Sequence, residues 1–147
     1  MARDRSLPDR LARAGLQVDF VHGWESRGSD SFAPRGHVNH HTAGGRNGAQ
    51  PSLNICVNGR SDLPGPLCNI FLPREESRRV IVVAAGRANH AGSGGWRGLS
   101  GNSSVYGVEC EHVGTGAEGL SALRYDNMVR IAAAVAFGQF GAHSRCW

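Results

Sequence analysis

Histidines and two closely spaced glutamates are the residues of this sequence that could carry chemistry. Imidazole nitrogens are common zinc ligands, and a catalytic zinc site keeps three protein ligands and an open position for water. His22 and His37 lie beside expected loops and are interpreted as ordinary surface residues. The other histidines stand at the ends of expected elements: His40, His41, His90, His112 and His143. Taken singly, each is more typical of a structural residue than of a metal ligand.

The adjacent pair His40 and His41 ends an expected strand and opens into a glycine-rich turn. Successive side chains of a strand point to opposite faces of its sheet. Only one of the two imidazoles can therefore face a given cavity.

Glu109 and Glu111 are two residues apart in an apolar segment that is expected to be a strand. This spacing puts both carboxylates on the same face. Burying two acids together is costly unless they are paired, hydrogen-bonded or catalytic. On spacing alone, an exposed polar face and a catalytic pair remain equally good interpretations.

The elements that would position these residues alternate between helix and strand. Helices are expected at 7–15, 49–58 and 122–140, the last of these on helically spaced apolar residues. Strands are expected at 16–21, 38–42, 67–72, 80–85 and 105–111. Residues 91–104 form a long glycine- and serine-rich loop, a kind of segment that is often functional. This order predicts a single α/β domain with a central mixed β-sheet flanked by helices.

Composition narrows the classes of function. The 147 residues suit one domain, and the net charge of +4 favours an anionic partner surface. The sequence has no basic helix, and its aromatic residues do not alternate with basic ones, so nothing in it indicates nucleic-acid binding. No signal peptide and no stretch of about 20 apolar residues is present, so we expect no membrane insertion and synthesis in the cytoplasm. The cysteine spacings fit no disulfide scaffold, and Cys56, Cys68 and Cys110 are expected to be free buried thiols.

Four motifs then follow one another in an order typical of a known family. They are His40-His-Thr-Ala-Gly-Gly, Leu63-Pro-Gly-Pro-Leu-Cys, Ala84-Ala-Gly-Arg-Ala-Asn-His-Ala-Gly and Gly107-Val-Glu-Cys-Glu. Their order resembles that of type 2 N-acetylmuramoyl-L-alanine amidases and peptidoglycan recognition proteins, and looks closest to endolysins of phages that infect actinobacteria. The final segment, Gly141-Ala-His-Ser-Arg-Cys-Trp, is similar to the part of these proteins that carries their second zinc histidine.

The resemblance implies a zinc site in which His40 is the first ligand and His143 the second, with His41 structural. It implies that Glu109 activates the zinc-bound water. It also implies that His90 lines the substrate side of the cleft, and that Asn102 orders the loop before the Glu109 strand.

The implied function is zinc-dependent hydrolysis of the amide between N-acetylmuramic acid and L-alanine in bacterial peptidoglycan. The implied protein is a monomeric endolysin that acts on the cell wall after release from the host cytoplasm. The alternative is a non-catalytic peptidoglycan-binding module of the same fold.

The sequence departs from the family pattern in three places. The segment 73–80 is longer than the tight hairpin turn usual there, and Asn69 stands where many relatives carry a histidine. The chain also stops at Trp147, before the last ligand of the family. We therefore expect residues 1–147 to be an amidase domain truncated at its C-terminal end, with weak zinc binding. Cys146 is the alternative third ligand.

Overall fold

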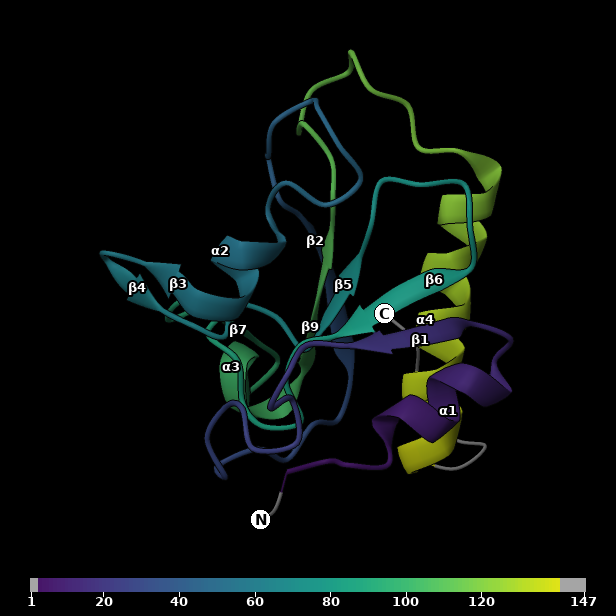
Figure 1. The fold of residues 1–147 in the computed structure, drawn as a ribbon. Coiled ribbons are helices and arrows are strands. Elements are labelled where there is room, and N and C mark those ends of the chain that lie inside the picture. The colour runs from purple at the N-terminus through teal and green to yellow at the C-terminus, as the bar shows by residue number, and fades with distance from the viewer. Residues whose placement is uncertain (1–2, 141–147) are drawn as a thin grey trace.

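The computed structural model describes residues 3–140, and its centre is a five-stranded sheet (Figure 1). The strand order is β1-β6-β5-β9-β2, with bounds Gln17–Phe20, Arg79–Val82, Ile70–Leu72, Tyr106–Cys110 and His37–His41. Three of the neighbouring pairs are parallel, whereas β5 and β6 run antiparallel. The predicted α/β domain with a mixed central sheet is confirmed.

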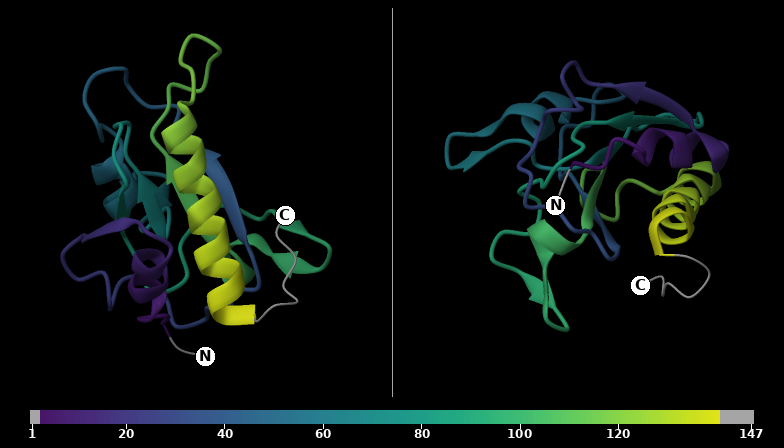
Figure 2. Two further views of the ribbon diagram at one scale, coloured as in Figure 1. Left: turned by 90° about the vertical axis from the view of Figure 1, so that its right-hand side faces the viewer. Right: turned by 90° about the horizontal axis from the view of Figure 1, so that it is seen from below.

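Helices cover both faces of this sheet. On one face α1 (Leu7–Arg13) packs beside α4 (Ala122–Phe140), as Figure 2 shows in its left view. The core on that side is built from apolar strand residues such as Ile70, Val80 and Val108. The opposite face is covered by α2 (Leu53–Asn58), which packs on side chains that alternate with the first set, among them Phe71 and Ile81. The inner strands β5 and β6 are therefore buried and apolar on both sides, as expected at the centre of a sheet.

Two small hairpins complete the described part of the chain. One pairs β3 (Gly59–Arg60) with β4 (Leu63–Pro64). The other pairs β7 (Gly95–Trp96) with β8 (Leu99–Ser100), and α3 (Gly101–Ser104) follows directly.

The second hairpin corrects the expectation that residues 91–104 form a structureless loop. Its turn residues Arg97 and Gly98 both have positive φ, 46° and 78°. This backbone suits the two-residue turn that matches the twist of a hairpin. Glycine and serine composition predicts turns, but it carries no alternating apolar pattern from which such a short hairpin could be recognised.

The other elements lie close to their predicted positions, with shorter ends. The strand expected to reach residue 85 ends at Val82, because the amides of Val83 and Ala84 both donate to the single carbonyl of Asn69. As expected, Cys56, Cys68 and Cys110 are free and buried. Among residues 3–140, no helix is long and apolar enough to span a lipid bilayer.

Candidate active site

Strand register brings His40 and Glu109 together. They are Cα partners on the parallel strands β2 and β9, so their side chains lie on the same face of the sheet. Phe71 is the partner of Glu109 on β5 and belongs to the core under α2, so this is the face that α2 covers. His41 pairs with Cys110, which belongs to the opposite core. The adjacent histidines thus face opposite sides, as the sequence predicts.

His90 reaches His40 from the loop that follows β6. The distance from His40 Nε2 to His90 Nδ1 is 3.1 Å. The other ring nitrogen of His90, Nε2, lies 3.2 Å from the carbonyl oxygen of Val105. Gly107 makes room for this ring, since a Cβ at that position would lie 2.4 Å from His90 Cγ. Two histidines that are 50 residues apart therefore form one hydrogen-bonded pair.

Burial keeps both imidazoles neutral near pH 7. Desolvation lowers the pKa of His90 to about 4, and the neighbouring His40 contributes to this lowering. Desolvation also lowers the pKa of His40, with a smaller contribution from His41. Neutral imidazole is the form that binds metal ions.

The carboxylate of Glu109 is half-buried, and its Oε2 has no hydrogen-bond partner within the described part of the chain. Desolvation raises the pKa of Glu109 from its ordinary value of 4.5 to about 7, and the charge of Glu111 adds to this rise. A carboxyl group with a pKa near the working pH can both accept and donate a proton.

Glu111 has the opposite environment, although it is only two residues away. Its side chain is fully buried and accepts three hydrogen bonds, from Thr42 Oγ1 at 2.6 Å, Ser52 N at 2.8 Å and Ser52 Oγ at 2.9 Å. Gly44 passes so close that a Cβ there would lie 2.4 Å from Glu111 Oε1. The exposed-face interpretation of the two glutamates is therefore wrong. One is hydrogen-bonded into the fold and the other is left unpaired.

Asn102 is buried in α3 and fastens the loop that follows His90. Its Oδ1 accepts from the amide of Ala91 at 2.8 Å, and its Nδ2 donates to the carbonyl of Gly92 at 2.9 Å. Both polar groups of the side chain are thus engaged by backbone, so Asn102 shapes the wall beside the histidine pair.

A groove of about 590 Å³ opens beside β2 and includes His40. Its other walls are the loop after His90, the β7–β8 hairpin and the residues around α3, represented by Ala91, Leu99 and Gly101. His37 also lines it and is half-buried in β2, which corrects its interpretation as an ordinary surface residue.

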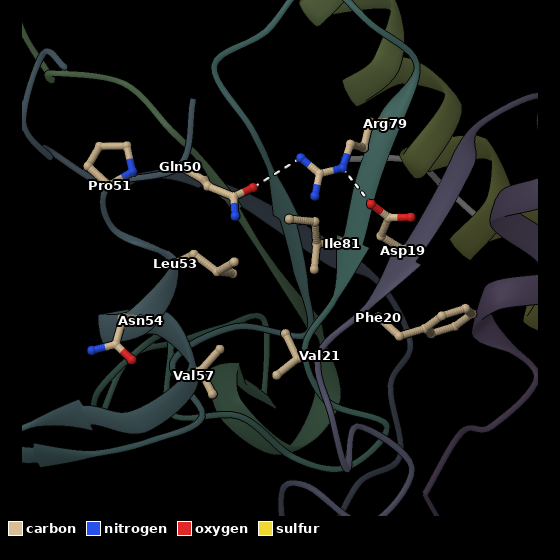
Figure 3. A pocket seen from close by; sticks show the side chains of 10 residues that line it. All are labelled: Asp19, Phe20, Val21, Gln50, Pro51, Leu53, Asn54, Val57, Arg79 and Ile81. Atoms are coloured by element: carbon tan, nitrogen blue, oxygen red, sulfur yellow. Dashed lines mark hydrogen bonds and ion pairs between the residues drawn. The ribbon is translucent and has the colours of Figure 1, made fainter. Parts of the chain in front are cut away.

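A second hollow, of about 620 Å³, lies between α2 and strands β1 and β6 (Figure 3). Apolar side chains such as Val57 and Ile81 line it. Its two charged lining residues, Asp19 and Arg79, form an ion pair with each other at 2.5 Å. Of Glu109, His40 and His90, only His40 lines either hollow, and it lines the first one.

The described residues do not form a metal site by themselves. Within residues 3–140, no three His, Cys, Asp or Glu side chains are grouped closely enough to hold an ion. His143 and Cys146 lie outside the described residues. The imidazole of His40 and the unpartnered buried carboxylate oxygen of Glu109 lie on one face of the sheet, and both are ligand types that suit a divalent ion such as zinc. His112 is separate, since its Nε2 lies 2.9 Å from the carbonyl oxygen of Glu118.

Two further residues contribute to this arrangement and are not predicted from the sequence. Gly107 sits inside an otherwise apolar strand, and a glycine in such a place often marks a close approach, here of the His90 ring. Ser52 stands before α2 and gives Glu111 two donors. Its position before a helix indicates a cap, but no local pattern connects it with a strand 59 residues later.

Comparison with known protein families finds a match over most of the chain. The sequence model of the family described as N-acetylmuramoyl-L-alanine amidase matches residues 30–143. Among solved structures, the chain is similar to the crystal structure of Staphylococcus aureus hydrolase AmiA in complex with its ligand, with 17% sequence identity and a TM-score of 0.46. The match covers 92% of this chain and 60% of that chain. No curated protein matches the sequence significantly.

Proposed function

The chain belongs to the N-acetylmuramoyl-L-alanine amidase family, and we propose that it hydrolyses the amide between N-acetylmuramic acid and L-alanine in bacterial peptidoglycan. The observation that carries the proposal is the pairing of His40 with Glu109 on one face of the sheet. Such a hydrolysis needs a ligand for a metal ion, which His40 can provide, and a proton acceptor, which the unpaired carboxylate of Glu109 with its pKa near 7 can provide.

Zinc is the metal that we propose for this site, with His40 and His143 as its family ligands. His40 is neutral at pH 7 and lines the groove, which suits that role. The chemistry that zinc supplies when bound is Lewis acidity, which lowers the pKa of a coordinated water to near 7 and polarises a carbonyl.

Glu109 is the general base in this proposal. Its carboxylate takes a proton from the attacking water as the water oxygen bonds to the lactyl carbonyl carbon. The same proton then passes to the nitrogen of L-alanine as the carbon–nitrogen bond breaks, so the stem peptide leaves as an amine. The raised pKa of Glu109 favours both transfers near neutral pH.

His90 and Asn102 belong to the substrate side of the site in this proposal. Asn102 holds the backbone of Ala91 and Gly92, which precedes the hairpin along the groove. Because these hydrogen bonds already order this wall, binding of a substrate does not have to provide the free energy of ordering it.

We further propose that the protein is a phage endolysin, acting as a monomer on the cell wall after its release from the host cytoplasm. The motif order described above supports this role, and the net charge of +4 suits encounter with an anionic wall. The alternative is a binding module that lacks catalysis.

Product analysis separates these functions. Purified peptidoglycan is incubated with the chain and zinc, and the soluble products are identified by mass spectrometry. The proposal expects free stem peptides that begin with L-alanine, together with glycan whose lactyl groups are free carboxylates. Glu109→Gln is the matched control and should release little of either. Cosedimentation of the chain with the wall without any released peptide would instead establish the binding module.

A further inference from the structure

We propose that His90 is a positioning residue, which fixes the tautomer of His40 so that His40 Nδ1 is the nitrogen left for the metal. This inference rests on the proposed function in one respect, the use of His40 as a ligand. The hydrogen-bond geometry around His90 carries it.

The first step is the tautomer of His90. Its Nε2 lies 3.2 Å from the carbonyl oxygen of Val105, and a carbonyl oxygen only accepts, so Nε2 carries the hydrogen. A neutral imidazole has a single N–H. With its hydrogen on Nε2, the neutral ring of His90 has its lone pair on Nδ1, the nitrogen that faces His40.

The second step is the tautomer of His40. Its Nε2 faces His90 Nδ1 at 3.1 Å. Since His90 Nδ1 accepts, His40 Nε2 must donate and therefore carries the only hydrogen of this neutral ring. The lone pair of His40 is then on Nδ1. Metal-binding histidines commonly donate their other ring N–H to an outer acceptor that fixes their orientation. Here the acceptor is a second imidazole, anchored on a backbone carbonyl.

The third step is the fixed position of that acceptor. A Cβ at position 107 would come within 2.4 Å of His90 Cγ and 2.7 Å of its Cβ, so the ring lies directly on the backbone of β9. The next residue, Ala91, is held through its amide by Asn102. His90 is therefore fixed from the sheet, from Val105 and from α3, as a residue that orients another side chain must be.

A competing arrangement would make both histidines ligands of one ion, through His40 Nε2 and His90 Nδ1. Their separation of 3.1 Å is compatible with two nitrogens on one metal. That arrangement requires the opposite tautomer of His40, so the two are distinguishable before any metal is added.

The first experiment measures tautomers in the metal-free chain at pH 7 by long-range ¹H–¹⁵N NMR of the histidine rings. The Nε2–H form is expected for His40. His90→Ala should give His40 a mixture of tautomers, whereas His90→Asn, which keeps an acceptor near the Nδ1 position, should restore the single form. A wild-type His40 in the Nδ1–H form would overturn the proposal, as would a tautomer that does not respond to His90→Ala.

The second experiment measures zinc affinity by competition with a chelating dye, and ligand geometry by the absorption spectrum of the cobalt-substituted chain. His90→Ala should lower zinc affinity about 10–100-fold, with an unchanged cobalt spectrum at saturation. Gly107→Ala should reproduce the loss by displacing the ring, and His90→Asn should recover most of it. His22→Ala, in an exposed residue of a loop, is the matched control and should leave affinity unchanged. A cobalt spectrum altered by His90→Ala would make His90 a ligand and sink the positioning role.

Failure of the two proposals is distinguishable. A folded wild-type chain that binds no zinc would remove the proposed metal chemistry, while the tautomer of His40 would still decide what His90 does. Conversely, if the chain binds zinc and is active but the tautomer of His40 does not change in the His90 variants, the proposed function stands and the positioning role of His90 is refuted.

Discussion

Glu109 and Glu111 stand two residues apart in the sequence, yet they belong to two regions with opposite character. The buried carboxylate cluster consists of Glu111, Thr42, Ser52 and the close backbone of Gly44. The groove cluster consists of Glu109, His40 and His90, of which His40 lines the groove and the other two lie next to it on the same face or in contact with its ring. In the first, three donors satisfy one carboxylate. In the second, a carboxylate oxygen is buried without a hydrogen-bond partner among residues 3–140, and the two imidazoles are neutral.

The difference shows how this fold separates stability from chemistry. Buried polar groups are nearly always hydrogen-bonded, and a group left unsatisfied costs free energy. Such a group is also the one whose pKa moves toward the working pH and whose lone pairs remain available. The buried carboxylate cluster ties the end of β9 to the turn after β2 and to the start of α2. These hydrogen bonds therefore hold the end of the strand that carries Glu109.

The largest effect should follow from neutralising Glu109. In the Glu109→Gln variant, the rate of peptide release from peptidoglycan should fall about 10²–10⁴-fold, because a general base is lost. Circular dichroism and zinc content should match those of the parent. A variant that digests cell wall at the parental rate would show that Glu109 is not the base.

Histidine replacements on β2 should separate the two faces of the strand. His40→Ala should abolish zinc binding, since it removes the proposed ligand. His41→Ala should leave zinc binding intact, because His41 is exposed and lies on the opposite face. Zinc titration of both variants checks this. Equal loss from two folded variants would refute the assignment of His40.

Removing the side chain of Glu111 should mainly destabilise the protein. Glu111→Ala leaves the donors of Thr42 and Ser52 without their acceptor, which should cost about 3 kcal/mol or more of unfolding free energy. Urea unfolding of the metal-free chain measures this cost. A variant as stable as the parent would mean that the buried carboxylate cluster contributes no net stability.

The pH dependence of stability should distinguish the two carboxylates further. Because the folded state raises the pKa of Glu109 from 4.5 to about 7, its ionisation opposes folding. The stability that protonated Glu109 contributes is fully present below pH 4.5 and is lost as pH rises through 7. Glu109→Gln should therefore be more stable than the metal-free parent by at most about 3 kcal/mol at pH 8, and by much less at pH 5. Urea unfolding in the presence of a chelator at both pH values tests this, and an equal difference at the two would contradict the raised pKa.

The smallest effect is expected for a single donor of the buried carboxylate cluster. Ser52→Ala removes the hydroxyl that donates to Glu111 but keeps the backbone amide bond. The loss should be about 1–2 kcal/mol, typical of a hydrogen bond to a charged acceptor. Ser31→Ala, in an exposed serine of a loop, is the control. If Ser52→Ala costs as much as Glu111→Ala, the cluster depends on that hydroxyl alone.

The sequence by itself determined the elements and the facing of their side chains. Apolar periodicity is a local property, and it located the strands around His40 and Glu109 and the long helix α4 to within a few residues. The two-residue period of a strand also determined that His40 and His41 face opposite sides, and that Glu109 and Glu111 share one. These conclusions need only neighbours along the chain.

Only the tertiary structure decided which of the two carboxylates is satisfied by hydrogen bonds. Whether a carboxylate is satisfied depends on donors that approach from elsewhere, and Ser52 reaches Glu111 across 59 residues of sequence while no donor reaches Glu109 Oε2 within the described chain. The pairing of His40 with His90 likewise needs the ring to lie on Gly107 and bond to Val105. Such contacts depend on strand register and loop closure, which no local pattern encodes.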